Sequence, residues 1–367
     1  MSSLSSLPER LLLGPGPSNV SDEVRAALAR PPIGHLDPAF LALLDQMQGQ
    51  LRRVFKSDSA FAFPLSGTGS AGMEACLVNL LEPGETALVA VNGVFGERIS
   101  TIAERAGARV VRVEAEMGQI VPPERLVAEI DARRPALVAL VHAETSTGVA
   151  QPIAEVAAAA RRAGALVVLD CVTSLSGMDV RFDEWQIDAA YSGTQKCLAC
   201  PPGLSPIALG ERALARLERR SRPVQSWYLD FTLIGRYLGA SRVYHHTAPI
   251  SMIYGLYAAL ERALAEGLEA RFARHRNASR LLIEGLEARG FEMLVAPEHR
   301  LPMLHSVIPP VADEAMLRRR LLETHGIEVG GGLGKLAGRI WRIGLMGENA
   351  RPEVVARLLA ALDKLCP

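Results

Sequence analysis

The sequence lacks an excess of charge of either sign, because 40 Lys and Arg residues balance 40 Asp and Glu residues among 367. Without a basic surplus or a charge block, we expect no nucleic-acid partner. No apolar run reaches the length of a membrane span, and the N-terminus lacks the basic and apolar regions of a signal peptide. We therefore expect a cytoplasmic protein without membrane attachment.

Cysteines are also few, and their spacing fits no disulfide framework. The five are Cys76, Cys171, Cys197, Cys200 and Cys366. Cys197 and Cys200 have the C-x-x-C spacing of redox and metal sites, but no second pair completes a zinc site. We expect reduced thiols and no metal, and a redox role for this pair stays an alternative.

What the sequence does have is an alternation of short apolar runs with amphipathic segments. The apolar runs are typical of strands and cover residues 60–65, 87–92, 108–114, 137–142, 166–170, 188–192 and 204–209. Segments with helical patterns cover residues 71–81, 95–106, 122–132 and 154–163. This alternation predicts an α/β large domain whose mainly parallel, seven-stranded sheet is flanked by helices.

The last third of the chain has a different pattern. A helical pattern without proline covers residues 250–290, which predicts two helices or one that passes between domains. Short β-like pieces and a helix near 352–365 then predict a smaller α+β domain. The Arg-rich run at 271–280 is expected to be a solvated helix face. At the other end of the chain, Pro and Gly at 14–17 exclude regular structure near the N-terminus. The expected divisions are an N-terminal arm at 1–20, a large domain at 21–265 and a C-terminal domain at 266–367.

A glycine loop, "SGTGSAG" at residues 66–72, has the G-x-G-x-x-G spacing of a dinucleotide site. Such a site needs an acidic residue at the end of the next strand, yet that strand ends at Asn92 and no acid occurs before Glu97. Hydroxyls beside the amides of a helix starting near Ala71 instead suit a compact phosphate. A simple strand-to-helix turn explains the same residues, so the loop alone does not decide.

Two charged residues follow later strands. Asp170 ends the run "ALVVLD", where α/β sheets bind ligands, although capping a helix is an alternative role. Lys196 lies among small and apolar residues in "AAYSGTQKCLACPPG", and burial would lower its pKa and make it nucleophilic. With the phosphate loop, these residues predict pyridoxal phosphate, with Lys196 forming the Schiff base and Asp170 keeping the pyridine nitrogen protonated.

Four motifs then make the chain resemble the fold-type I, class V aminotransferases, in particular the alanine–glyoxylate and serine–glyoxylate group. The similarity extends over residues 11–350. The motifs are "SGTQKCL" at 192–198, "HAETSTGVAQP" at 142–152, "YHHTAPIS" at 244–251 and "GRIWRIGLMG" at 338–347.

This resemblance implies a role for each matching residue. Lys196 would carry the cofactor and move the proton, and Asp170 would pair with the pyridinium. Val172 and Phe95 would cover the two faces of the ring, and Thr145 would bond to its phenolic oxygen. The expected phosphate-binding residues are Thr68, Gly69, Ser70 and Gln195.

The resemblance also implies a shared site and a substrate clamp. In the family, Tyr and Thr of "YHHT" reach the phosphate of the neighbouring subunit, so Tyr244 and Thr247 imply a homodimer with shared active sites. His245 and His246 are expected to be structural. Arg342 is expected to bind the substrate α-carboxylate through two parallel bonds, with a surface ion pair as the alternative role.

The implied activity is transamination from alanine or serine to glyoxylate, giving glycine and pyruvate or hydroxypyruvate. The backbone of "GPGPSN" at 14–19 is expected to line the substrate end and favour small amino acids. Another class V transaminase, acting on aspartate, phosphonate or kynurenine-type substrates, stays open. A cysteine desulfurase would need a nucleophilic cysteine on a loop, for which Cys366 is the candidate. A dehydrogenase or a non-catalytic binding protein is a further alternative, and the presence of both Lys196 and Asp170 argues against it because neither would need them.

Overall fold

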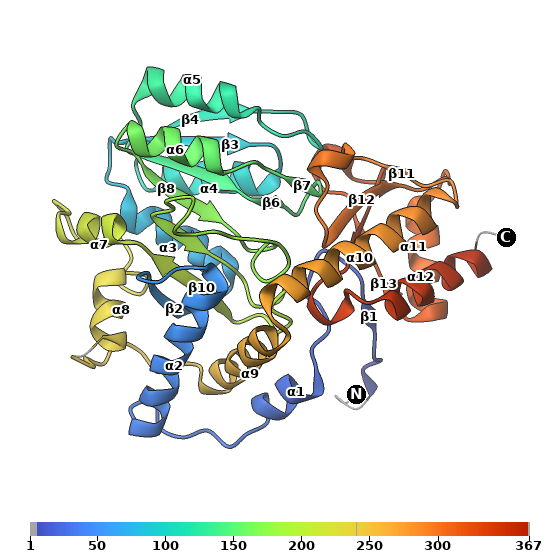
Figure 1. Cartoon of the computed structure of the whole chain (residues 1–367), viewed down its shortest axis with the longest axis horizontal. Coiled ribbons are helices and arrows are strands. Elements are labelled where there is room, and N and C mark those ends of the chain that lie inside the picture. The colour runs from blue at the N-terminus through green and yellow to red at the C-terminus, as the bar shows by residue number, and fades with distance from the viewer. Residues whose placement is uncertain (1–5, 240, 366–367) are drawn as a thin grey trace.

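The computed structural model describes residues 6–239 and 241–365, in a larger and a smaller packed part (Figure 1). The larger part is built on a seven-stranded sheet of order β2–β10–β9–β8–β5–β3–β4. Only β10 runs antiparallel to its neighbours. The strands are β2 Phe61–Ser66, β3 Thr86–Val91, β4 Arg109–Glu114, β5 Leu137–Val141, β8 Leu166–Asp170, β9 Ala189–Tyr191 and β10 Leu204–Leu209. The predicted mainly parallel, seven-stranded sheet is confirmed.

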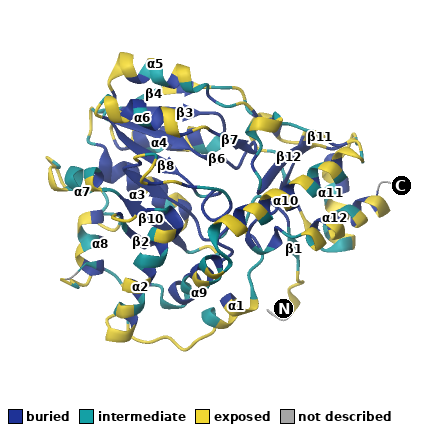
Figure 2. Ribbon diagram, viewed as in Figure 1, coloured by how far each residue is buried: buried dark blue, intermediate teal, exposed yellow. Residues whose placement is uncertain are grey.

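Helices cover both faces of this sheet, which is why its inner strands are continuous apolar runs (Figure 2). Every residue of β5, β8 and β10 is buried. Helix α3 (Gly69–Leu80) packs against α4 (Val94–Arg105), and α5 (Pro123–Arg133) packs against α6 (Ala154–Arg162). These are the helices that the sequence predicted. Four further helices were not predicted: α1 Asp22–Leu28, α2 Pro38–Phe55, α7 Glu211–Glu218 and α8 Phe231–Leu238.

The long helical pattern is two helices. Helix α9 (Ile250–Glu266) ends at Gly267, whose φ of 84° no helix interior adopts, and α10 (Leu268–Glu287) follows at once. The run at 271–280, expected to be a solvated helix face, exposes Arg276 and Arg280 but buries Arg271. Arg271 is 2% exposed, pairs with Glu266 at 2.7 Å and donates to the carbonyl of Cys197 at 2.6 Å. A helical pattern cannot reveal such carbonyl partners, because they come from a distant loop.

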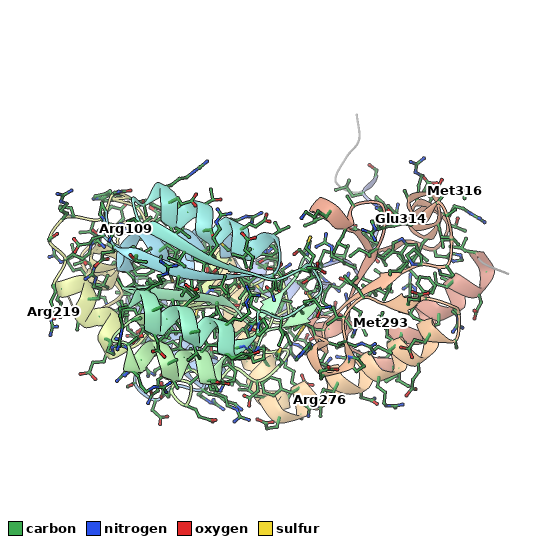
Figure 3. The ribbon with its side chains drawn as sticks, turned by 90° about the horizontal axis from the view of Figure 1, so that it is seen from above. Arg109, Arg219, Arg276, Met293, Glu314 and Met316 are labelled. Carbon is green, nitrogen blue, oxygen red and sulfur yellow. The ribbon has the colours of Figure 1, made fainter. Side chains whose placement is uncertain are left out.

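The smaller part has an antiparallel sheet and its own apolar cluster around Trp341. In Figure 3, Met293 and Met316 lie at its end of the molecule, and Arg109 and Arg219 lie at the opposite end. Its strands are β11 Glu292–Met293, β12 Leu304–Ile308, β14 Gly330–Gly331 and β15 Trp341–Gly344, and its helices are α11 Glu314–His325 and α12 Pro352–Leu365. Three short 3-10 turns span Pro297–His299, Gly334–Leu336 and Gly347–Asn349. The exact division at residue 266 stays a prediction.

The N-terminal segment contains regular structure, contrary to expectation. Leu11–Leu12 (β1) pairs in parallel with Ile327–Glu328 (β13), and Leu13 is buried in the apolar cluster of the smaller part. Pro and Gly constrain only the stretch that follows. The segment then turns back to the larger part, where the Ser18 amide donates to the carbonyl of Gln195 at 2.9 Å. The arm therefore joins both parts.

No helix among the described residues has the length and apolar character that crossing a membrane requires. Within the same residues, no group of three or more His, Cys, Asp or Glu side chains is placed to hold a metal ion. Burial raises the pKa of both Cys197 and Cys200 to about 12, which leaves little thiolate for redox chemistry. Cys366 lies outside the described residues.

Candidate active site

Apart from Tyr244, Thr247 and Arg342, the predicted site residues follow strands of the large sheet, in segments that leave the carboxyl ends of its parallel strands (Figure 1). A two-stranded ribbon, β6 (Ala143–Glu144) with β7 (Val149–Ala150), shapes the loop after β5. These segments are residues 67–68 and the start of α3 after β2, 92–93 and the start of α4 after β3, 142–148 after β5, 171–173 after β8 and 192–196 after β9.

Lys196 is buried beneath the N-terminal segment. Its side chain is 8% exposed, and its Nζ donates to the carbonyl of Pro15. Gly16 has a φ of 107°, and a Cβ there would lie 2.7 Å from the Lys196 Nζ, so only glycine fits. Burial, together with the charge of Arg342, lowers the pKa of Lys196 to about 8. The neutral, nucleophilic form of this amine is therefore far more abundant near neutral pH than that of an ordinary lysine.

Asp170 is buried, with both carboxyl oxygens held by donors. Its Oδ1 accepts from the Val172 amide at 2.9 Å, and its Oδ2 accepts from the Tyr191 hydroxyl at 2.8 Å. Burial raises the pKa of Asp170 to about 7. A cation beside this carboxyl would lower its pKa again, so the site favours a positively charged partner. Tyr191 was missed from the sequence, although its place at the end of β9, just before "SGTQK", was a usable signal.

The glycine loop lies directly against the Asp170 turn. Helix α3 begins at Gly69, two residues before the predicted start, and the side chain of its N-cap Thr68 makes no capping hydrogen bond. Gly67 has a φ of 142°, and a Cβ there would lie 2.6 Å from that of Ala71. A Cβ on Gly69 would lie 3.1 Å from Val172. The uncapped, positive end of α3 thus faces the site and suits an anion.

Gln195 lies next to Lys196, in the segment that follows β9. A Cβ on Gly193 would lie 2.9 Å from its Oε1, which is buried and has no hydrogen-bond partner among the described residues. Phe95 is half-buried at the start of α4. The guanidinium carbon of Arg98 lies 5.0 Å from the Phe95 ring centroid, and Arg98 also donates to the Ser70 hydroxyl at 3.4 Å. Helix α4 and the glycine loop are therefore in contact.

Arg342 is a buried guanidinium held only by carbonyls. Its Nε donates to the Gly331 carbonyl at 2.8 Å, and one terminal nitrogen donates to the Thr145 carbonyl at 3.2 Å. Its hydrogen-bond partners among the described residues are these two carbonyls, and the charge of Glu144 acts on it only through space, so the alternative of a surface ion pair finds no support there. The Thr145 hydroxyl shares a hydrogen bond of 2.6 Å with Thr173. Unpaired N–H groups on a buried guanidinium form a binding site for a carboxylate.

The structure does not bring Tyr244 and Thr247 together with Lys196. Both are exposed, and Tyr244 is 58% exposed. Their motif nevertheless lies beside the glycine loop, because a ring nitrogen of His246 is 2.6 Å from the Ser66 hydroxyl. Their role toward a neighbouring subunit stays a prediction.

Comparison with known proteins agrees with this geometry. Residues 23–342 match the model of the aminotransferase class-V family. The chain belongs to this family. It is 38% identical to the (S)-ureidoglycine–glyoxylate transaminase of Bacillus subtilis, over 97% of this chain and 90% of that protein. It is 37% identical to the alanine–glyoxylate aminotransferase of Drosophila melanogaster, over 98% and 92%.

Solved structures give the same assignment. The alanine–glyoxylate aminotransferase of Nostoc sp. superposes on the whole chain with a TM-score of 0.98, at 46% identity and 98% coverage of that structure. The ureidoglycine–glyoxylate aminotransferase of Bacillus subtilis covers 98% of the chain and 93% of its own length, with a TM-score of 0.96 and 38% identity. The predicted family and fold of this class-V aminotransferase are confirmed.

Proposed function

We propose that this aminotransferase moves the amino group of a small amino acid, alanine or serine, to glyoxylate, using pyridoxal phosphate. The observation that carries the proposal is the convergence of a buried amine at Lys196, a buried carboxyl at Asp170 and a guanidinium at Arg342 that bonds to carbonyls but to no carboxylate of the described residues. Relatives named for alanine and glyoxylate support the substrates.

The residues present fit pyridoxal phosphate. The uncapped start of α3, with its free backbone N–H groups, suits its phosphate, and Asp170 suits its ring nitrogen. Val172 and Phe95 offer apolar surfaces for the two faces of an aromatic ring. When bound, this cofactor supplies an aldehyde for Lys196 and a ring that draws electrons from the substrate α-carbon.

Three residues of the chain then have separate roles in the reaction. Lys196, whose lowered pKa of about 8 makes the neutral amine accessible, can take a proton from the substrate α-carbon and return it elsewhere. Asp170, fixed by Tyr191 and Val172, supplies the negative charge that keeps a ring nitrogen protonated. Arg342 binds the carboxylate, which the amino donor and the oxo-acid acceptor share, so one guanidinium orients both.

A homodimer with shared sites is part of the proposal. An exposed patch of large apolar and aromatic side chains surrounds the "YHHT" motif, and such patches mark interfaces. Its members are Trp227, Tyr228, Val243 and Tyr244.

We expect mixed dimers to test this sharing. A Lys196→Ala subunit and a Tyr244→Ala subunit are each impaired alone, but their mixed dimer contains one site with an intact Lys196 and an intact Tyr244. Activity after co-refolding should therefore exceed that of both parents. A mixture no more active than the Tyr244→Ala parent would mean that Tyr244 serves its own subunit.

The lowered pKa of Lys196 predicts a pH dependence for cofactor capture. Only the neutral amine attacks an aldehyde, and the lowered pKa makes it abundant above about pH 8. The rate at which apoprotein combines with pyridoxal phosphate should rise about tenfold per pH unit below 8 and level off above it. Stopped-flow absorbance measures this rate, and a midpoint near that of an ordinary lysine would contradict the assignment.

Replacing Arg342 with lysine should weaken the binding of both substrates. The planar fork that grips a carboxylate is lost, so KM for the amino donor and for glyoxylate should each rise about 10- to 100-fold. Steady-state kinetics measures both values. Arg339→Lys, an exposed arginine nearby, is the matched control and should change neither. A rise confined to one substrate would contradict a shared carboxylate clamp.

A panel of amino donors with glyoxylate tests the substrates. Alanine or serine should support glycine formation at rates well above those of aspartate. (S)-Ureidoglycine belongs in the panel because a relative at 38% identity is named for it. Activity with ureidoglycine or aspartate alone would show that the donor is assigned wrongly, while the cofactor assignment would stand.

A further inference from the structure

Glu144 is a completely buried carboxylate that has no role in the proposed chemistry. Its Oε1 accepts from the amide and the hydroxyl of Ser146 at 3.0 and 2.6 Å, and its Oε2 accepts from the Phe95 amide at 3.2 Å. Burial raises the pKa of Glu144 above its ordinary value, and the bonds from Ser146 and from the amides of Phe95 and Gly96 offset only part of this rise. Each of these partners donates, which suits the ionised form.

These bonds form the cap of helix α4. The N-cap residue of α4 is Gly93, which has no side chain to cap with. The amide of Val94 instead donates to the Ser146 hydroxyl at 3.0 Å, and the next amide, of Phe95, donates to Glu144. The loop after β5 thus supplies hydrogen-bond acceptors for the free backbone N–H groups in the first turn of α4. It also places a negative charge at the positive end of this helix.

The close fit depends on glycine at position 93. Its φ of 176° is extended backbone that any residue adopts, so conformation does not require glycine. A Cβ there would, however, overlap the Glu144 carboxyl and the Ser146 hydroxyl. The missing side chain is what lets the two capping groups reach the helix.

The other side of this helix start is open. A cleft of about 720 Å³ lies between it and the 3-10 turn of the smaller part, lined by Gly93, Val94, Lys335 and Leu336 among others. On the closed side, Glu144 and Ser146 hold the first two amides of the turn, and Phe95 packs against the apolar cluster of the larger part and against Arg98. Phe95, in that turn, carries the ring assigned to one face of the cofactor.

We propose that Glu144 is a positioning residue that, together with Ser146, caps α4 and thereby holds the Phe95 ring in place against the cofactor. This inference rests on the proposed function. Loss of the cap frees the first turn toward the cleft, so the ring no longer presents a fixed surface, and cofactor affinity falls without any direct contact being removed.

A double-mutant cycle on pyridoxal phosphate affinity tests the proposal. Apoprotein is titrated with the cofactor and followed by circular dichroism, and Tm of each apoprotein is measured in parallel. Glu144→Gln and Phe95→Ala should each weaken affinity about tenfold, and the double variant should bind no more weakly than Phe95→Ala alone. Asp313→Asn, which removes the same charge from the cap of α11, is the matched control and should leave affinity unchanged.

Two results would overturn the proposal. The first is a Glu144→Gln variant that binds the cofactor with wild-type affinity. The second is a double variant whose affinity is about a hundredfold weaker, the product of the two single losses, because Glu144 would then act independently of Phe95. If Glu144→Gln does not fold, Ser146→Ala takes its place in the cycle with the same expectations. Wild-type apoprotein that binds no cofactor would refute the proposed function as well, whereas normal wild-type binding with a failed cycle refutes this inference alone.

Discussion

Replacing Lys196 with alanine should reduce transamination on the order of 10⁴-fold, the largest loss expected from any single substitution. The variant lacks both the amine that reacts with the cofactor and the group that moves the α-proton. Glycine formation from glyoxylate, measured with saturating cofactor and donor, gives this loss.

The control for this variant is its stability. Lys196 is buried with its pKa lowered by desolvation, so replacing it with a small neutral residue removes a group that is costly to charge in the folded state. Tm of the apoprotein should therefore not fall. Lys196→Arg should be equally inactive, because a guanidinium does not lose its proton in a protein. Activity within tenfold of wild type in either variant would contradict the role of Lys196.

Replacing Asp170 with asparagine should lower kcat about 10³-fold, the second largest effect. The shape and one accepting oxygen are retained, but the negative charge that holds a ring nitrogen protonated is lost, and preorganised charges of this kind are worth 10²- to 10³-fold. Steady-state kinetics of the donor half and of the complete reaction would both show the loss.

Tyr191→Phe is the matched comparison for Asp170→Asn. It removes the hydroxyl that bonds to the Asp170 Oδ2 at 2.8 Å while keeping the carboxylate charge. We expect a loss of about tenfold, typical of one hydrogen bond to a charged group. Equal losses in the two variants would indicate that geometry, and not charge, is what Asp170 contributes.

The large sheet was predictable because each of its strands has a recognisable pattern in its own local sequence. The residues of β5 and β8 are buried on both faces and so form unbroken apolar runs in the sequence. The two-residue strand β1 could not be recognised in this way. Its partner, β13, lies more than three hundred residues further along the chain, and neither segment is long enough to have a pattern of its own.

The site residues likewise fall into those that the local sequence reveals and those whose role depends on distant partners. Lys196 and Asp170 could be found because each is out of place in its local sequence, a lysine among small residues and a carboxylate ending an apolar strand. Glu144 lies inside a recognised motif but was missed, because its partner Phe95 is 49 residues away and only the fold brings them together. Arg271 looked like a surface residue for the same reason, since its carbonyl partners come from distant loops.

Borohydride trapping tests the central claim, that this class-V aminotransferase works through pyridoxal phosphate on Lys196. Reduction converts a carbon–nitrogen double bond to a stable single bond, and the sequence contains only four lysines. The purified protein should be yellow and lose its colour on reduction, and peptide mass analysis should place the cofactor on Lys196. A colourless protein, or a label on Lys56, Lys335 or Lys364, would contradict the account.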